Sequence, residues 1–167
     1  MSWFEKPAEA PARVPTDAIW AVCPSCKAYV AKEAWRAADK VCPRCNHHER
    51  LNCRERVALL TDAGSFKELN AEVSFNDPLS FSDSSGAYAD KAKATVAKTG
   101  EGESILTGTA TVEKIAVVLG VMDFKFLGGS LGSGTGERIR LAAEKAIALK
   151  RPLILVSASG GERMHEG

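Results

Sequence analysis

The sequence predicts an α/β protein in which a small cysteine-rich module precedes a larger domain. Two observations predict this class. Four of the five cysteines fall in two Cys-Pro-x-Cys pairs within residues 18–50. From residue 104 onward, two β-rich runs are followed by an amphipathic helical pattern and a third short β-rich run. The order strand, strand, helix, strand is typical of a helix that crosses over a sheet.

Composition and charge favour a soluble, globular protein. The 167 residues carry a formal net charge of +1 and are 45% hydrophobic, so there is no general drive toward nucleic acid. The longest apolar run, Ile115 to Met122, is far shorter than the roughly 20 residues of a membrane-spanning helix, and we expect no membrane partner. The N-terminus lacks the basic-then-apolar order of a secretory signal, which predicts a cytoplasmic protein with reduced thiols.

The chain divides into four predicted segments. Residues 1–17 are rich in Pro, Ala and Glu and have no apolar period, which predicts a flexible N-terminal arm. Residues 18–50 hold both cysteine pairs and too few large apolar side chains to fold by burial alone. Residues 51–103 are expected to form a helical connecting region, and residues 104–167 the start of the larger domain.

Two helices are expected in the connecting region. Asn52 is a good N-cap for a helix over Cys53 to Asp62, which Gly64 can end. A second helix is expected near Tyr88 to Lys98. It follows a loop at residues 76–86, whose Pro, Ser and Gly residues do not sustain regular structure.

The larger domain begins with a predicted antiparallel hairpin. Ser104 to Val112 and Ile115 to Asp123 are β-rich runs separated by two residues. The second run is apolar at both odd and even positions. We therefore expect it to be buried on both faces.

A helix and a third strand follow. The residues of one predicted apolar stripe, spaced at i, i+3, i+4, i+7 and i+8, are Ile139, Ala142, Ala143, Ala146 and Ile147. Pro152 ends this helix, and Leu153 to Val156 predicts another short buried strand. The helix is therefore expected to pack against the sheet as a crossover.

The cysteine pairs predict a metal site. Cys23 and Cys26 are separated by two residues, as are Cys42 and Cys45, and fifteen residues lie between the pairs, which is typical of structural zinc. Each tight turn presents two thiolates to a tetrahedral ion. Four sulfur ligands leave no open position, so we expect one structural Zn²⁺ per chain and no metal catalysis. The alternative, four ordinary buried cysteines, is disfavoured by the spacing.

Three neighbouring residues are also metal-binding types. Cys53 has no partner at ligand spacing and is predicted to be a small apolar residue of the first helix. His47 and His48 could replace a ligand, but four cysteines already complete the site. We therefore expect both histidines to be polar surface residues.

A glycine-rich segment, Leu127 to Glu137, joins the second β-rich run to the helix. Its backbone N–H groups and the helix dipole predict a site for an anionic or carbonyl oxygen. It is not a Walker A loop, because the lysine that would reach the phosphates is missing. It is not a dinucleotide-binding loop, because Glu137 stands where the third glycine belongs. A plain packing turn is the alternative.

A second candidate segment, Ser157 to Gly167, follows the last predicted strand. Ser159 and Gly161 half match a nucleophile elbow, but Ser157 stands where the first glycine should be, so a serine hydrolase is disfavoured. Gly160 and Gly161 can instead turn backbone N–H groups toward a developing oxyanion.

Three motifs in order resemble one known family. They are Met1-Ser-Trp-Phe with the cysteine module running into Asn46-His47-His48, the segment Phe124 to Ser133, and the segment Ser157 to Gly167. Over nearly the whole chain they resemble the N-terminal portion of the β subunit of acetyl-CoA carboxylase carboxyltransferase of the bacterial and plastid type. The resemblance implies a zinc ribbon followed by the first part of a ClpP/crotonase-like domain of repeated ββα units.

The resemblance also implies a reaction and its partners. A carboxyl group passes from carboxybiotin, supplied by the biotin carboxyl carrier protein, to acetyl-CoA, which forms malonyl-CoA for fatty acid biosynthesis. Carbanion character at the acetyl methyl group must be stabilised as an enolate, which requires fixed N–H donors near the thioester oxygen. The other implied partners are a carboxyltransferase alpha subunit and biotin carboxylase, in an ATP-binding, cytoplasmic hetero-oligomer.

Site residues are implied in the same way. Gly160, Gly161 and Glu162 match the family segment that supplies backbone oxyanion donors. Gly128 and Gly129 match the glycine-rich loop of the acyl-CoA and biotin pocket.

Two features depart from the family pattern. Glu162 and His165 stand where the family commonly has alanine and glutamine, and a carboxylate at 162 would oppose an enolate unless it points away. The family also continues past the position of Gly167 through more ββα units, including a second glycine pair. We therefore expect a fragment or truncated product that is inactive by itself.

A binding role is the second hypothesis. The basic residues in and after the cysteine module are Lys32, Arg36, Lys40, Arg44, Arg50, Arg54 and Arg56. Such a cluster is typical of a solvated face, and it is also typical of a zinc ribbon that contacts nucleic acid. A scaffold for subunit assembly is the third hypothesis.

Overall fold

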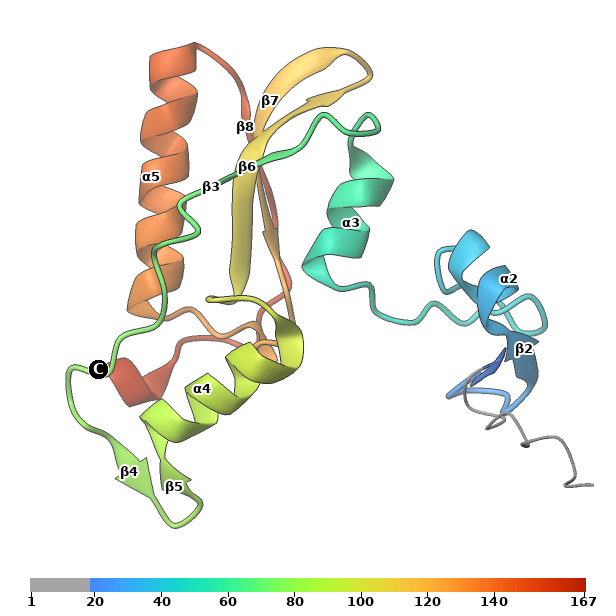
Figure 1. Cartoon of the computed structure of the whole chain (residues 1–167), viewed down its shortest axis with the longest axis horizontal. Helices are drawn as coiled ribbons and strands as arrows, with labels where there is room; N and C mark the ends of the chain where they lie inside the picture. The colour runs from blue at the N-terminus through green and yellow to red at the C-terminus, as the bar shows by residue number, and fades with distance from the viewer. Residues whose placement is uncertain (1–18) are drawn as a thin grey trace, which may run out of the picture. The chain divides into compact units, whose positions relative to one another are not determined.

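The structure, a computed structural model, describes residues 19–167, and the predicted arm at residues 1–17 lies outside them. The chain forms two compact units, the first ending at Arg50 and the second beginning at Leu51 (Figure 1). None of the helices within residues 19–167 is long and apolar enough to cross a membrane.

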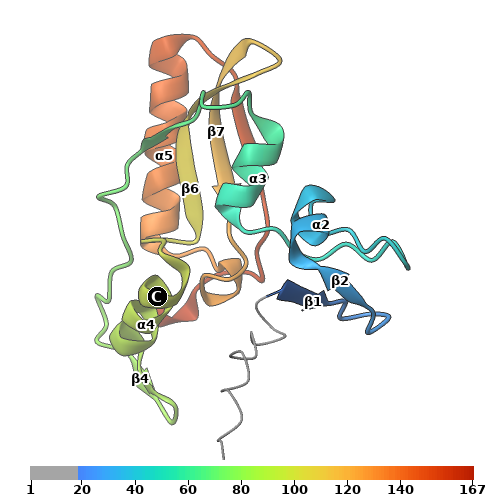
Figure 2. The same ribbon diagram turned by 45° about the vertical axis from the view of Figure 1, so that its right-hand side comes forward.

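The first unit contains a hairpin and a short helix (Figure 2). Strands β1 (Trp20–Val22) and β2 (Tyr29–Ala31) pair antiparallel, and helix α2 (Lys32–Ala37) follows directly. The buried core consists of Cys23, Val30, Trp35 and Cys42. The indole of Trp35 donates a hydrogen bond of 3.0 Å to the Glu49 carboxylate. So small an apolar core agrees with the expectation that burial alone does not hold this unit.

The second unit is built on a four-stranded sheet in the order β3-β6-β7-β8. Strand β3 (Lys67–Leu69) pairs antiparallel with β6 (Ile105–Val112), which pairs antiparallel with β7 (Ile115–Met122). Strand β8 (Leu153–Val156) is parallel to β7, and helix α5 (Ser133–Leu149) connects the two. The predicted hairpin and crossover helix are both confirmed.

Helices cover both faces of this sheet, with α5 on one side and α3 (Cys53–Leu60) on the other (Figure 1). The core on the α3 side consists of Cys53, Val57, Leu106, Ala110, Val117, Leu119 and Val121. The core on the α5 side consists of Val118, Ala142 and Ala146. Alternate residues of β7 thus face opposite cores, and the expected burial of this strand on both faces is confirmed.

Both predicted helices of residues 51–103 are present. Asn52 caps α3 in a reciprocal arrangement, because its side chain accepts from the Glu55 N–H and the Glu55 carboxylate accepts from the Asn52 N–H, each at 2.8 Å. Helix α4 (Tyr88–Thr99) ends at Gly100, whose φ of 77° is the left-handed conformation that glycine adopts readily.

The first helix ends at Leu60, two residues earlier than predicted. The hydroxyl of Thr61 donates to the Val57 carbonyl, and Thr61 itself is extended. Beyond it, the Asp62 carboxylate accepts from the backbone N–H of Lys114 at 2.8 Å, at the β6–β7 turn. Asp62 therefore belongs to the packing of the hairpin and not to the helix.

Three short strands in residues 51–103 were not predicted. Besides β3, strands β4 (Ser82–Asp83) and β5 (Gly86–Ala87) form a separate two-stranded sheet. They have two or three residues each and no apolar alternation, so periodicity does not detect them.

The predicted stripe on α5 is only partly right. Ala142 and Ala146 are buried, but Ile147 is 77% exposed. The buried face includes Arg138, which is 1% exposed and donates to the carbonyls of Val73, Ile105 and Ala71. The spacing of apolar residues does not indicate a charged side chain that is buried because it donates to three carbonyls.

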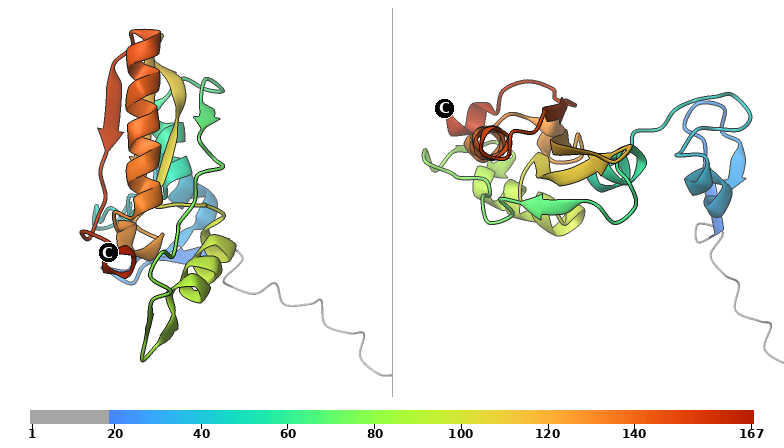
Figure 3. Two further views of the ribbon diagram at one scale, coloured as in Figure 1. Left: turned by 90° about the vertical axis from the view of Figure 1, so that its left-hand side faces the viewer. Right: turned by 90° about the horizontal axis from the view of Figure 1, so that it is seen from above.

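The predicted burial of β8 is wrong at two positions. Ile154 is 37% exposed and Leu155 is 46% exposed. Among the described residues β8 pairs only with β7, which places it at an edge of the sheet (Figure 3). The apolar run therefore predicts the strand correctly but does not predict how deeply the strand is buried.

Candidate functional site

The four predicted metal ligands form one cluster in the first unit. The Sγ atoms of Cys23, Cys26, Cys42 and Cys45 all lie within 4.8 Å of one another. The Cys23–Cys45 and Cys26–Cys42 sulfur distances are both 3.7 Å. A tetrahedral ion with metal–sulfur bonds of about 2.3 Å requires sulfurs about 3.8 Å apart. The cluster therefore fits a metal ion in geometry as well as in ligand type.

Two similar turns build this cluster. The Lys27 N–H donates to the Cys23 carbonyl at 3.0 Å, and the Asn46 N–H donates to the Cys42 carbonyl at 2.9 Å. Lys27 and Asn46 both have left-handed backbone, with φ of 59° and 55°. The same local fold therefore follows each Cys-Pro-x-Cys sequence, which explains why the spacing alone located the site.

The sulfurs differ in acidity before any ion binds. Burial alone would raise the pKa of Cys42, but backbone N–H groups of Arg44 and Cys45 lower it to about 6. The Ala28 N–H lowers the pKa of Cys26, but burial and the adjacent sulfurs outweigh it and raise the pKa to about 11. Cys42 therefore forms a thiolate readily and Cys26 does not, so a cation would be needed to stabilise thiolates at both positions.

The neighbouring metal-binding residue types lie outside the cluster. His47 and His48 do not belong to it. Cys53 is 1% exposed in the core of the second unit, so the prediction of a small apolar role is confirmed. Burial raises the pKa of its thiol.

The two predicted active-site segments lie side by side in the second unit. The Gly160 N–H donates to the Gly128 carbonyl at 2.9 Å, and the Leu131 N–H donates to the Gly161 carbonyl at 2.9 Å. The Arg163 N–H donates to the Leu131 carbonyl at 3.0 Å. Both segments follow the carboxyl ends of parallel strands, β7 and β8, which meet at one edge of the sheet.

Close packing makes one glycine of the first loop necessary. Gly129 has φ of 66°, and a Cβ built there would lie 2.0 Å from the Ala158 carbonyl oxygen. At Gly128, with φ of 70°, a Cβ would meet nothing within 4 Å. The glycine-rich loop is therefore also a packing turn, and the two interpretations of it are compatible.

Several amides of the predicted oxyanion site already have partners. The Gly160 N–H is bonded to Gly128, and the Gly129 N–H donates to the Phe126 carbonyl at 2.8 Å. The Gly161 N–H donates to the Ser159 hydroxyl at 3.1 Å. The Ser159 side chain can rotate about its Cα–Cβ bond and move its oxygen away, whereas a backbone carbonyl in a packed loop cannot. Gly161 therefore has the most readily redirected N–H of these three.

The start of α5 does hold an anionic oxygen, and the chain itself supplies it. The backbone N–H and the hydroxyl of Ser133 both donate to the Glu166 carboxylate. Glu166 therefore caps this helix and occupies the positive end of its dipole.

A buried ion pair beneath the two loops was not predicted from the sequence. The guanidinium of Arg163 contacts the Glu103 carboxylate through two hydrogen bonds of 2.6 and 2.8 Å. The exposed fractions of the two side chains are 1% and 0%. In the sequence, the position of Arg163 two residues after Gly161 indicates that it lies near the candidate site. No sequence feature places Glu103 there.

The residues that depart from the family pattern have different environments. The Glu162 side chain is exposed. The His165 ring stacks on Tyr88, with ring centroids 5.0 Å apart, and meets the Phe81 ring edge-on at the same distance. His165 is therefore part of an aromatic cluster, while Glu162 lies in solvent.

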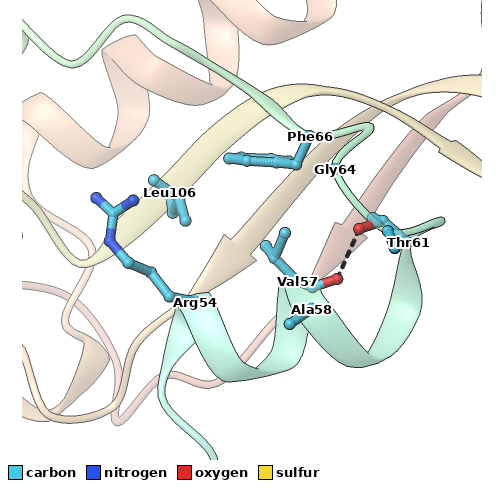
Figure 4. Close-up of a pocket in the computed structure, with 8 residues that line it drawn as sticks. Arg54, Val57, Ala58, Thr61, Gly64, Phe66 and Leu106 are labelled. Carbon is cyan, nitrogen blue, oxygen red and sulfur yellow. Dashed lines mark hydrogen bonds between the residues drawn. The ribbon is translucent and has the colours of Figure 1, made fainter.

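A groove of about 410 Å³ lies between α3 and the segment that leads into β3 (Figure 4). Val57, Phe66 and Leu106 give it an apolar floor. Arg54 at its rim is paired with Glu101 and Glu68. None of the predicted site residues lines this groove.

The predicted basic cluster is divided between the two units. Arg54 and Arg56 belong to the second unit, and the other five basic residues belong to the first. Because Arg54 is also paired with carboxylates, fewer charges remain for phosphate groups. Nucleic-acid binding stays a prediction.

Known proteins similar to this chain are carboxyltransferases. Acetyl-coenzyme A carboxylase carboxyl transferase subunit beta of Parasynechococcus marenigrum (strain WH8102) is 44% identical over 151 residues, which cover 90% of this chain and 51% of the relative. The subunit of the same name from Synechococcus sp. (strain RCC307) is 40% identical and matches 100% of this chain and 60% of its own length. The chain thus spans about half the length of the curated relatives it matches.

Solved structures agree with the fold. The transcarboxylase 12S structure with hydrolysed methylmalonyl-coenzyme A bound superposes with a TM-score of 0.58 at 27% identity, over 71% of this chain and 20% of that chain. The β subunit of P. aeruginosa geranyl-CoA carboxylase has a TM-score of 0.51 at 19% identity, over 80% of this chain and 22% of that chain, which supports the fold alone. The expected α/β class, with a four-cysteine module and a crotonase-like domain, is confirmed.

The carboxyl transferase domain model matches residues 45–167. This range includes both candidate loops and the whole four-stranded sheet. Because the match covers well over half of the chain, the chain belongs to the carboxyl transferase domain family.

Proposed function

We propose that the chain is part of a carboxyltransferase subunit of acetyl-CoA carboxylase, which forms malonyl-CoA from acetyl-CoA and carboxybiotin. The observation that carries this proposal is the pairing of the glycine-rich loop with the turn at residues 159–161, through the Gly160–Gly128 and Leu131–Gly161 hydrogen bonds. Two glycine-containing segments held together at the carboxyl ends of parallel strands form a backbone-lined site suited to a thioester oxygen.

In the proposed reaction, the acetyl methyl group loses a proton and its carbon bonds to the carboxyl carbon. The bond from that carboxyl carbon to the biotin nitrogen breaks, and the nitrogen recovers a proton. Negative charge develops on the thioester oxygen as the enolate forms, so an N–H donor there lowers the barrier. Removing one oxyanion-hole donor from a serine protease costs about 10²- to 10³-fold in kcat, and we expect a loss on that order here.

Gly161 is the best candidate for this donor. Its N–H is held by the Ser159 hydroxyl at 3.1 Å, and substrate oxygen can replace that hydroxyl when it rotates. Gly160 and Glu162 are the adjacent candidates, with Gly128 and Gly129 forming the opposite wall of the pocket. The exposed Glu162 carboxylate lies in solvent, where water and salt screen its charge.

The cysteine cluster is proposed to hold one structural Zn²⁺. Sulfur distances of 3.7 Å support a tetrahedral ion, and four sulfur ligands leave no position for substrate. The ion would supply on the order of 10 kcal/mol to the folding of the first unit. It would take no part in carboxyl transfer.

The wider assembly is also a proposal. The relatives are called subunit beta, which supports a partner subunit for this chain, here an alpha subunit. The biotin carboxyl carrier protein and biotin carboxylase would complete an ATP-dependent complex of fatty acid biosynthesis in the cytoplasm.

Acetyl-CoA labelled with ¹³C at the carbonyl tests the proposal on the chain itself. We expect the bound thioester carbonyl signal to shift when an N–H donates to its oxygen, and we expect free CoA to bind more weakly. Malonyl-CoA formation is then measured with carboxybiotin, with and without the alpha subunit. Absence of acetyl-CoA binding, together with absence of transfer in the assembled mixture, would refute the proposal.

A further inference from the structure

The side chain of Arg163 contacts four separate segments near the candidate site. Besides Glu103, its guanidinium donates to the Ser130 carbonyl at 2.9 Å and to the Ser130 hydroxyl at 3.0 Å. It also donates to the Tyr88 hydroxyl at 3.2 Å and to the Glu166 carboxylate at 3.0 Å. One buried group thus joins α4, the start of β6, the glycine-rich loop and the end of the described chain.

These contacts lie directly behind the two loops. Ser130 immediately follows Gly129, and Arg163 is two residues beyond Gly161. A Cβ at Gly132 would lie 2.5 Å from Nη1 of Arg163, so this glycine leaves the space that the guanidinium occupies. The local sequence of the glycine-rich loop therefore accommodates the arginine in addition to forming a turn.

The Arg163 guanidinium stays charged in spite of its burial. Burial alone would lower the pKa of Arg163, but the hydrogen bonds to Glu103 outweigh this and raise it. The Tyr88 hydroxyl also donates to the Glu166 carboxylate, and this contact is part of the same network. A buried charge pair contributes little net stability compared with an apolar replacement, so the geometry that it enforces is its main consequence.

We propose that Arg163 is a positioning residue, which with Glu103 fixes the distance between the Gly160–Gly161 amides and the glycine-rich loop. This inference rests on the proposed function, because the Gly161 N–H is proposed there as the donor to the thioester oxygen. A planar guanidinium presents two parallel N–H groups to Glu103 and keeps others for Ser130. A lysine ammonium carries the same charge on a single nitrogen and cannot hold both groups in one plane.

The first test is amide hydrogen exchange on the chain with Arg163→Lys. We expect amide exchange to become faster on the order of tenfold in residues 127–131 and 157–163. These loops should open locally once the hydrogen bonds of the guanidinium are lost. The β6–β7 amides should keep the protection of the unmodified chain. Arg140→Lys is the matched control, because Arg140 lies on α5, is about half exposed and pairs with Glu137 and Glu144.

Ser130→Ala is the milder variant, which retains every charge. It removes only the hydrogen bond from Arg163 Nε to the Ser130 hydroxyl. We expect a smaller acceleration of exchange in the same two segments. If Arg163→Lys does not fold, this variant decides the question, and unchanged exchange in both segments would overturn the inference.

The second test connects position to chemistry. With ¹³C-labelled acetyl-CoA, Arg163→Lys should reduce the shift of the bound thioester carbonyl more than it weakens the binding of free CoA. In the assembled enzyme, kcat should fall on the order of 10²-fold with a smaller change in KM, as expected from misplaced donors. Faster exchange with an unchanged carbonyl shift and kcat would overturn the role in the reaction.

The two proposals fail in different ways. If the unmodified chain binds no acetyl-CoA, the proposed function fails, and the exchange data still decide whether Arg163 holds the loops. If acetyl-CoA binds and Arg163→Lys leaves exchange in both loops unchanged, the positioning inference fails and the proposed function stands.

Discussion

Glu103 and Arg163 form a two-point ion pair in the interior of the second unit, with bonds of 2.6 and 2.8 Å, although 60 residues separate them in the chain. Glu103 also accepts a hydrogen bond of 2.7 Å from the Thr135 hydroxyl near the start of α5. The carboxylate thus connects the beginning of β6 to both the crossover helix and the turn after β8.

Glu103→Gln should destabilise the second unit strongly. The change removes the two-point partner of the buried Arg163 charge and leaves it only the single carboxylate contact with Glu166, and breaking one side of a buried pair typically costs about 3–5 kcal/mol. Urea unfolding followed by circular dichroism measures the loss. The double variant with Arg163→Met removes both charges and should be less destabilised than the sum of the single variants. Simple additivity would contradict the ion-pair assignment.

The parts of the fold that could be predicted from the sequence are those with local causes. Each Cys-Pro-x-Cys pair forms its own turn, so spacing sufficed to group the four sulfurs. The β6–β7 hairpin and the Asn52 cap likewise depend on residues close in the chain.

The remainder depends on contacts between distant residues. A glutamate and an arginine usually lie in solvent, so nothing in the pattern indicated that Glu103 and Arg163 are buried together. Arg138 was missed for the same reason, and its burial displaced the predicted stripe of α5. The capping of α5 by Glu166 could not be foreseen either, because 33 residues separate Ser133 from this carboxylate.

Removal of the metal should unfold the first unit and leave the second intact. All three tryptophans lie in residues 1–50, and Trp35 packs in the core with Cys23 and Cys42. Chelation or Cys26→Ser should therefore shift tryptophan emission to that of exposed indole, because zinc supplies on the order of 10 kcal/mol to such units. Metal analysis should give one zinc per chain. Cys53→Ala, which changes the other cysteine, should retain the zinc.

The two glycines of the first loop should respond differently to alanine. Both have left-handed backbone, which costs alanine roughly 1–2 kcal/mol. Only at Gly129 would the added Cβ also collide, 2.0 Å from the Ala158 oxygen. We expect Gly128→Ala to lower the free energy of unfolding by about that strain alone. Gly129→Ala should lower it by more and should accelerate amide exchange in the adjoining turn. Thermal unfolding of both variants checks this, and equal costs would argue against the close approach.

Acid should weaken the anchoring of the last described residues through Glu166. Burial alone would raise its pKa, but the hydrogen bonds from Tyr88 and Ser133 and the contact with Arg163 outweigh this and lower it. Its contribution to stability is therefore full above the ordinary carboxyl pKa of about 4.3 and is lost as pH falls through the lower folded-state value. Glu166→Gln should flatten the acid side of a stability–pH curve. Glu144→Gln, at an exposed carboxylate, is the control and should leave the curve unchanged.

Ser159→Ala distinguishes the two chemical interpretations of the turn after β8. The Ser159 hydroxyl accepts from the Gly161 N–H at 3.1 Å and lies 3.2 Å from the Gly161 carbonyl. If Gly161 is an oxyanion donor, this hydroxyl competes with the substrate oxygen for its N–H. Removing a competing hydrogen bond is worth about 1 kcal/mol, so acetyl-CoA should bind about fivefold more tightly.

A serine nucleophile predicts the opposite result. Under that interpretation Ser159→Ala removes the attacking oxygen, and activity should disappear with little change in acetyl-CoA affinity. Isothermal titration with acetyl-CoA and with free CoA separates the two outcomes, because only the former carries the thioester oxygen. Ser157→Ala is the matched control, since Ser157 is exposed and two residues away on the same segment. Tighter binding of acetyl-CoA but not of CoA, in Ser159→Ala alone, would assign the Gly161 N–H to the thioester.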